Sequence, residues 1–341
     1  MLHRFAKFVA GCTVLLVLAG SLVTSTDSGL SVPDWPTTYG WNMFTFPPSK
    51  WVGGILYEHG HRLIASSVGF LTIVLAVWLW MAEPRRWMRW LGVGALGAVI
   101  AQGVLGGLTV MFFLPAPIST AHAGLAEIFF CITVAIALFT SRRWIEGYGG
   151  HVADEPSLRR VATATTALIF CQILVGATMR HTRAGLAIPD FPLMFGHLWP
   201  THWDAKIAVH FAHRLGALLV AIAVCTTVVA VFRRTTFGEL RRPATLLIAL
   251  VCMQITLGAL TVLSKRDVWI NSVHVVCGAL VLTTTLVLTL RTWRAKFATD
   301  VHTLRLRTNP VQLTASAKAT AVRRSLWRRR KPDTSYGKAS A

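Results

Sequence analysis

Four histidines occupy matched places in an apolar chain, and their spacing is the first indication of chemistry. His61 and His122 are separated by 61 residues, and so are His213 and His274. Each stands near the start of a long apolar segment. Ionisable side chains are costly inside a bilayer, so their presence in such segments predicts a function. We expect two pairs of imidazoles at similar depth, each pair facing across a bundle of helices.

Two facing imidazoles in an apolar environment suit heme iron. Histidine is a common axial ligand of heme, and an apolar pocket between helices suits the macrocycle. Zinc fits less well, because two histidines do not complete a tetrahedral site. A single membrane histidine could equally be a proton relay or a packing residue with one hydrogen bond. Duplication at a fixed spacing favours the heme ligand.

Charged residues accompany the first histidine of each pair. Arg62 and Arg214 directly follow it, and a guanidinium matches the carboxylate of a heme propionate. Snorkelling to lipid headgroups is a compatible interpretation. Glu58 lies three residues before His61, on the same helix face, and its counterpart in the other pair is His210. A carboxylate that is present in only one half suggests that this half carries out the chemistry, while the other half holds a permanent redox cofactor.

Two more polar residues fall inside apolar segments. His59 points about 100° away from the face shared by Glu58 and His61, and we interpret it as an interface residue. Glu127 has Ala279 at the matching place in the second half. It could pair with a neighbouring side chain or with a cofactor group, and the sequence does not decide between them.

The elements that position these residues are transmembrane helices. Of 341 residues, 54% are hydrophobic and only 14% charged, and the mean hydropathy is +0.55. A soluble domain carries about 25% charged residues, so a polytopic membrane protein is predicted. The first apolar segment could instead be a signal peptide, but an internal repeat gives it a partner helix. The eight expected spans are 6–24, 54–81, 89–111, 118–140, 161–179, 206–232, 243–263 and 269–290.

The chain repeats itself. "QGVLGGLTVM" at 102–111 matches "QITLGALTVL" at 254–263, an offset of 152 that the histidines share. Upstream, "TDSGLSVPDWPTTYG" at 26–40 matches "TRAGLAIPDFPLMFG" at 182–196, with an offset of 156. The shared "GLxxPDxP" loop is rich in turn residues, and we expect Asp34 and Asp190 to cap or close it.

Each half contributes an even number of spans, so both halves have the same orientation. The predicted fold is all-α, with eight transmembrane helices arranged as two parallel four-helix-bundle repeats. The expected divisions are residues 1–145 for the first bundle, 146–292 for the second and 293–341 for a basic tail.

The net charge of +20 is unevenly distributed. Most Lys and Arg fall in the connections on the side of the two termini and in the tail. The positive-inside rule therefore predicts cytoplasmic termini and a location in the cell membrane, inner or plasma. The tail is expected to be disordered and to lie against anionic lipid headgroups. A nucleic-acid partner is not expected, because charge alone is a nonspecific signal.

The cysteines predict no extracytoplasmic disulfide. All six lie within expected spans, where a cysteine behaves as a small apolar residue. No loop contains one, and no CxxC motif occurs. They are Cys12, Cys131, Cys171, Cys225, Cys252 and Cys277.

The motifs together resemble the heme A synthase family over roughly residues 8–292. The resemblance is carried by Glu-x-x-His-Arg at 58–62, the second His-Arg at 213–214, His122, His274 and the twin loops. It implies a heme-dependent membrane oxidoreductase that oxidises the C8 methyl of heme O to the formyl group of heme A, for terminal oxidases. His213 and His274 would ligate a heme b cofactor. His61 and His122 would serve the half that receives heme O, with Glu58 important for turnover.

The chain departs from some members of this family in one respect, and two other functions are alternatives. Some members of the family carry a cysteine pair in the first outer loop, and residues 25–53 have none. A non-enzymatic b-type cytochrome, passing electrons between quinone and a partner, would use the same histidine pairs. A transporter fits less well, because the polar residues gather near one face of the membrane. A heme O synthase is the expected supplier, while the electron donor and the oligomeric state are not identified by the sequence.

Overall fold

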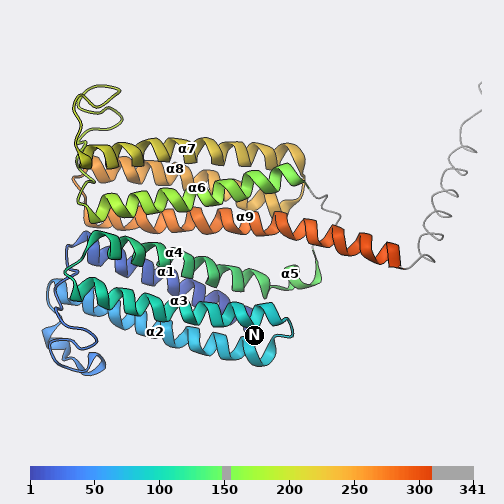
Figure 1. Ribbon diagram of the computed structural model, residues 1–341, viewed down its shortest axis with the longest axis horizontal. Coiled ribbons are helices and arrows are strands. Elements are labelled where there is room, and N and C mark those ends of the chain that lie inside the picture. Colours follow the sequence, from blue (N-terminus) through green and yellow to red (C-terminus); the bar gives the residue numbers. More distant parts are fainter. Residues whose placement is uncertain (148–154, 309–341) are drawn as a thin grey trace, which may run out of the picture. The chain divides into compact units, whose positions relative to one another are not determined.

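The computed structural model describes residues 1–147 and 155–308, with side chains described up to Arg294. The described chain is helical, apart from loops and two isolated β-bridges. Figure 1 shows the α-helices, which run over Leu2–Ser25 (α1), Gly54–Ala82 (α2), Arg86–Met111 (α3), Ala116–Phe139 (α4), Arg142–Glu146 (α5), Pro156–His181 (α6), Ala205–Arg234 (α7), Gly238–Leu263 (α8) and Val268–Thr308 (α9). Two short 3-10 helices, Met43–Thr45 and Pro48–Lys50, lie in the first long loop.

Eight of the described helices are long and apolar enough to cross a membrane: α1–α4 and α6–α9. The predicted all-α polytopic fold is confirmed. In a bilayer each backbone N–H and C=O must find its partner within the protein, and an apolar segment of this length satisfies that need by becoming a helix. Most of the helices extend past the expected spans by a few residues at one or both ends, because polar residues at the membrane surface continue the same backbone pattern.

The compact unit ends at Thr292, where the tail was expected to begin, but the last helix continues beyond it. α9 continues through residues 293–308, to Thr308. Neither Gly nor Pro occurs between Arg291 and Thr308, so nothing in this stretch breaks the helix before Asn309 and Pro310. Residues 309–341 lie outside the described residues, and the prediction for them stays a prediction.

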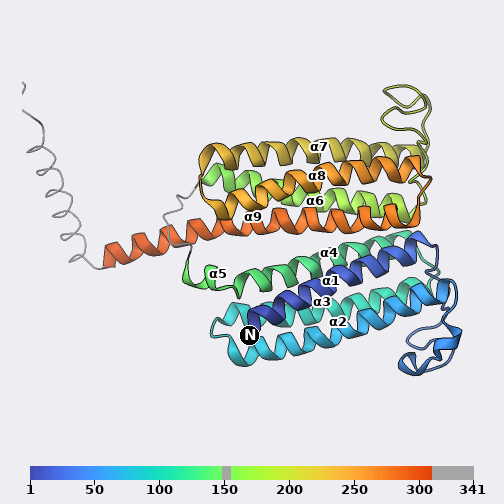
Figure 2. The same ribbon diagram turned by 180° about the vertical axis from the view of Figure 1, so that it is seen from behind.

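Residues 1–292 form one compact unit with two groups of four helices (Figures 1 and 2). In the first bundle, α1 and α3 each pack against both α2 and α4. In the second, α7 packs against α6 and α8. α9 closes this group: Cys277 Sγ donates to Leu250 O on α8 at 3.4 Å, and Thr166 on α6 bonds Thr289 at 2.9 Å. The two bundles meet where α4 packs on α6.

Each bundle has its apolar core in the half away from the two long loops. In the first bundle this core includes Val9, Leu79, Met88 and Ile136, which lie near the loop-distal ends of α1–α4. In the second it includes Leu158, Val228, Leu240, Leu247 and Leu288. The loop-side half of each bundle is therefore left for the histidines.

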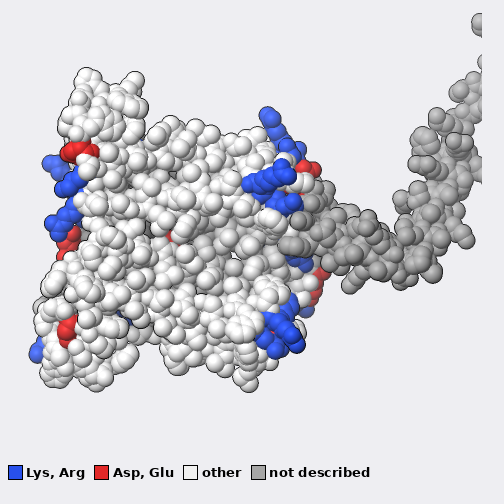
Figure 3. All heavy atoms as spheres, viewed as in Figure 1, with Lys and Arg blue, Asp and Glu red and all other residues white. Residues whose placement is uncertain are grey.

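The long loops, residues 26–53 and 182–204, lie at the same end of the unit (Figures 1 and 2). Charged side chains gather at its two ends, and the surface between them is nearly all uncharged (Figure 3). Such a band suits a lipid environment. The chain is thus a multi-pass membrane protein.

A buried polar cluster joins the bundles near the loop end. Ser25 Oγ accepts hydrogen bonds from Asn271 Nδ2 and Ser272 Oγ, both at 2.9 Å, and from Arg180 Nη2 at 3.1 Å. Arg180 Nη2 also donates to Ser21 O at 2.6 Å. These residues come from α1, α6 and α9. Hydrogen bonds between helices add to the packing that holds the bundles together.

Candidate functional site

The four predicted histidines lie in two pairs, one in each bundle. His61 on α2 and His122 on α4 belong to the first bundle, and His213 on α7 and His274 on α9 belong to the second. Both pairs sit near the loop end of their helices. The structure therefore brings together, within each bundle, the residues that share the 61-residue spacing.

Every one of these imidazoles rests against a glycine of the neighbouring helix. A Cβ built at Gly20, Gly106, Gly176 or Gly258 would lie 2.9–3.2 Å from the Cε1 atom of His61, His122, His213 or His274, respectively. Ordinary carbon contacts are longer, about 3.5–4.0 Å. The glycines thus let each ring lie directly on the backbone of the adjacent helix. They recur at the repeat offsets, which is a signal that the sequence analysis overlooked.

These glycines predict a selective effect of adding one methyl group. Gly106→Ala is expected to push His122 aside and to lower heme bound in the first bundle several-fold. Gly103→Ala, one turn away on α3, has nothing within 4 Å and is the matched control. Heme content and the absorption spectrum of each purified variant provide the measurement. Equal heme loss in both variants would contradict a positioning role for Gly106.

Each site offers two imidazoles and no third protein ligand. Among the described residues, no group of three or more His, Cys, Asp or Glu is placed to hold a metal ion. Heme needs no more, because the macrocycle supplies four nitrogens and the protein supplies axial ligands. Zinc needs three or four protein ligands. The buried Nδ1 atoms of His61, His122 and His274 have no hydrogen-bond partner among the described residues.

Glu58 anchors the first long loop to α2. Its carboxylate, on a residue that is 4% exposed, accepts from Val32 N at 2.8 Å and from Arg62 Nη2 at 2.7 Å. Arg62 also donates to the carbonyl oxygens of Val32, Asp34 and Thr37 at 2.7–3.0 Å. One guanidinium and one carboxylate thus fasten three loop residues above the His61 site.

His210 anchors the second long loop to α7 in the second bundle. Its Nδ1 lies 3.2 Å from Ile188 N and its Nε2 lies 3.2 Å from Arg214 Nε, and a neutral imidazole accepts a hydrogen bond at one of these two nitrogens. Arg214 donates to the carbonyl oxygens of Ile188, Asp190 and Leu193 at 2.7–3.1 Å. Each of these loop partners is related to its first-bundle counterpart by the offset of 156. The difference between Glu58 and His210 therefore leaves the loop anchor unchanged.

The two arginines have partners other than those predicted. Both guanidinium groups bond loop carbonyls, which holds the loop over the histidine pair. Their propionate role stays a prediction, and a propionate would have to share the guanidinium with these carbonyls. Snorkelling to headgroups does not describe Arg62, whose side chain is only 11% exposed.

The loops themselves close on their aspartates, as expected. Asp34 accepts from Tyr39 N at 2.7 Å and Gly40 N at 2.9 Å, and Asp190 accepts from Phe195 N and Gly196 N. Burial alone would raise the pKa of Asp34, but these hydrogen bonds outweigh it and keep the pKa below its ordinary value. The hydrogen bond from Gly196 N lowers the pKa of Asp190 in the same way.

His59 is a loop contact, and its interpretation as an interface residue is wrong. The side chain is fully buried beneath the first loop, where Nδ1 shares a 3.1 Å hydrogen bond with Thr38 Oγ1. The rings of Phe46 and Trp51 pack on it, with centroids 5.0 and 4.8 Å away. Helix geometry gave its direction, but only the fold of the loop supplied its partners.

Trp35 reaches the first site from the same loop. A Cβ at Gly107 would lie 2.5 Å from the Trp35 ring, so the indole lies against α3 beside Gly106. The repeat places Phe191 and Ala259 at the matching positions of the second bundle. Trp35 is larger than Phe191 and Gly107 is smaller than Ala259, so the two sites are lined differently at this position.

Glu127 lies apart from the histidines, near the contact between α4 and α6. It is 4% exposed, and its Oε2 has no partner in the described chain. Three residues earlier, Gly124 packs closely on Leu174 of α6. No ion pair to this carboxyl group is found among residues 1–147 and 155–294.

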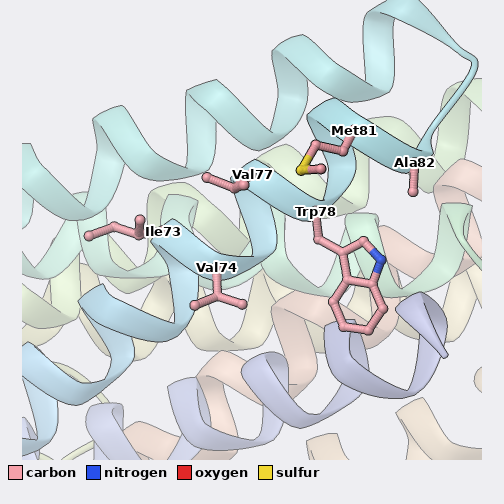
Figure 4. A pocket seen from close by; sticks show the side chains of 6 residues that line it. All are labelled: Ile73, Val74, Val77, Trp78, Met81 and Ala82. Carbon is pink, nitrogen blue, oxygen red and sulfur yellow. The ribbon is translucent and has the colours of Figure 1, made fainter.

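An apolar groove on α2 carries no chemistry. Figure 4 shows its lining residues, all from the loop-distal part of that helix. They include no ionisable side chain: Ile73, Val74, Val77, Trp78, Met81 and Ala82. The groove is three or more helical turns from His61, so it forms no part of the candidate site.

Similar proteins identify the family of this chain. Residues 3–286 match the COX15-CtaA family model, described as "Cytochrome oxidase assembly protein". The heme A synthase of Halalkalibacterium halodurans is 27% identical over 292 residues, covering 83% of this chain and 95% of that protein. Those of Symbiobacterium thermophilum and Geobacillus kaustophilus are 29% and 26% identical, covering 76% and 88% of this chain and 85% and 96% of theirs. With the match running through both histidine pairs, the chain belongs to the COX15-CtaA family of cytochrome oxidase assembly proteins.

Proposed function

We propose that this protein is a heme A synthase, a membrane oxidoreductase that converts the C8 methyl of heme O to the formyl group of heme A. The observation that carries the proposal is the presence of two partly buried histidine pairs, one per bundle, in a chain whose relatives are named heme A synthase. Two sites match a reaction that needs one heme as substrate and one as redox cofactor.

The second bundle is the proposed site of the heme b cofactor. His213 and His274 would hold it through the iron, and Arg214 would keep the loop closed above it. Such a heme supplies one-electron redox chemistry when bound. No protein side chain can oxidise an unactivated methyl group, so the proposal needs this chemistry.

The first bundle is the proposed substrate site. His61 and His122 bind the iron of heme O and orient the macrocycle, while the loop held by Arg62 excludes water. Glu58 is the proposed catalytic residue, because its carboxylate is the acidic group that lies one helical turn from His61 on the same face. There it can hold or move a proton during methyl oxidation. The loop hydrogen bonds fix its position for that task.

We place the protein in the cell membrane, with both termini in the cytoplasm and the long loops outside. A heme O synthase is the proposed supplier of substrate. An electron donor is required by the reaction and is not identified. The basic residues of the tail are proposed to contact anionic lipid headgroups and not nucleic acid.

The orientation predicts labelling from outside. Thr201→Cys, at an exposed position of the second long loop, should react with a membrane-impermeant maleimide in intact cells. The native cysteines are first removed. A cysteine at exposed Arg233, at the opposite end of α7, is the control and should react only after permeabilisation. The reverse pattern would overturn the orientation.

Coexpression with a heme O synthase tests the function. Hemes extracted from the membranes are separated by chromatography, and we expect a formyl heme only when both proteins are present. The rival, a b-type cytochrome without enzymatic activity, predicts bound heme b with heme O unchanged. A normal spectrum without any formyl heme, in a host that supplies oxygen and reductant, would therefore sink the synthase assignment.

A further inference from the structure

His213 differs from the other three site histidines in having a partner at Nδ1. Gln172 Nε2, on α6, lies 3.0 Å from His213 Nδ1 and also donates to His213 O at 2.7 Å. The Nδ1 atoms of His61, His122 and His274 are buried without a hydrogen bond. One amide thus holds the His213 ring at its second nitrogen and at its backbone.

A glycine on α7 makes room for this amide. A Cβ built at Gly216 would overlap Gln172 Oε1, so any larger residue there would displace the amide from its present position. The repeat offsets of 156 and 152 place Leu16 and Ile64 at the matching positions of the first bundle. Two matched positions therefore differ together: the second bundle has a glutamine and a glycine there, and the first bundle has two bulky apolar residues.

We infer that Gln172 is the positioning residue that makes His213 a permanent heme ligand, whereas Leu16 and Ile64 leave His61 exchangeable. A hydrogen bond at one ring nitrogen orients an imidazole and decides which nitrogen carries the proton. When Nε2 binds iron, Nδ1 carries the proton and needs an acceptor. In the heme-bound form Gln172 would accept this proton through Oε1: a half-turn of its terminal torsion exchanges Oε1 with Nε2 and gives up the bond from Nε2 to His213 O.

The inference rests on the proposed function, because it concerns heme in the second bundle. It explains how one repeat can retain its heme while the other releases product. The loop anchors do not provide this difference, since both bundles fasten their loops alike. Loss of an outer hydrogen bond to a metal-ligating histidine typically costs 10–100-fold in affinity.

The first test removes the amide. Gln172→Leu and the double variant Gln172→Leu/Gly216→Ile should both lose second-bundle heme 10–100-fold faster to excess apomyoglobin. The double variant fills the vacated space, so it separates the missing hydrogen bond from a packing defect. The midpoint potential should also rise, by about 59 mV if the ferric form is weakened tenfold more than the ferrous form. Cys171→Leu, at the adjacent exposed position, should leave both values unchanged.

The second test introduces the glutamine and the glycine into the first bundle. Leu16→Gln/Ile64→Gly should slow loss of first-bundle heme by a similar factor. The variant His213→Ala distinguishes failure of the proposed heme site from failure of the proposed role of Gln172. If His213→Ala loses the low-spin heme but the double variant at 172 and 216 keeps wild-type transfer rate and potential, the role of Gln172 is refuted and the heme site stands. If His213→Ala keeps that heme, the site assignment fails and this inference fails with it.

Discussion

Replacing His213 or His274 with alanine is expected to remove most of the low-spin heme b spectrum, whereas His61→Ala and His122→Ala leave much of it and stop formation of heme A. In the proposed assignment His213 and His274 would hold the heme iron of the second bundle, which suits electron transfer and stable retention. The first bundle would exchange substrate for product, so its occupancy is expected to be low or mixed. Reduced-minus-oxidised spectra and extracted hemes of the four purified variants measure both effects.

The control is that all four variants reach the membrane in similar amounts. Each histidine lies against a glycine, so truncation to alanine removes contacts without creating a clash. Equal loss of the stable heme in all four would refute the division of labour. Two equivalent cytochrome sites would then remain, and the electron-transfer alternative would be the better interpretation.

The second large effect is expected at Glu58. Glu58→Gln keeps an oxygen acceptor for Val32 N but removes the charge, and conversion of heme O should fall by about 10²–10⁴-fold, the usual contribution of a general acid or base. Heme binding should survive. The ratio of heme A to heme O in extracts gives the effect on chemistry, and the absorption spectrum gives the effect on binding.

Glu58→His separates catalysis from loop anchoring. It installs the residue type that stands at position 210 in the second bundle, where the ring nitrogens face Ile188 N and Arg214 Nε. The loop should stay anchored, which limited proteolysis between Thr37 and Trp51 can verify, while heme A formation is lost. The converse variant His210→Glu should keep activity. Wild-type heme A from Glu58→His would show that the carboxylate serves only the loop.

The sequence by itself determined the spans, the repeat and the histidine pairs. Apolar length predicts membrane helices because the lipid leaves the backbone no other partner. The matched motifs at offsets 152 and 156 gave equivalent positions without any structure, so His61 and His213, or Asp34 and Asp190, could be paired from their spacing alone. The closure of both loops on an aspartate also followed, because it is local: donor and acceptor are five or six residues apart.

Only the tertiary structure decided which side chains meet across helices. Three contacts depend on the relative rotation and depth of separate helices and on the fold of the loop. They are the bonds from Arg62 to loop carbonyls, the packing of His59 under Trp51, and the contact between Gln172 and His213. Sequence spacing does not specify either quantity. The same limit applies to Glu58 and His210: their chemical difference was visible in the sequence, but their common role as loop anchors was not. The common role became visible only from the positions of Val32 and Ile188 in the structure. A carboxylate oxygen and an imidazole nitrogen can accept equivalent hydrogen bonds only when the backbone N–H is placed to donate them.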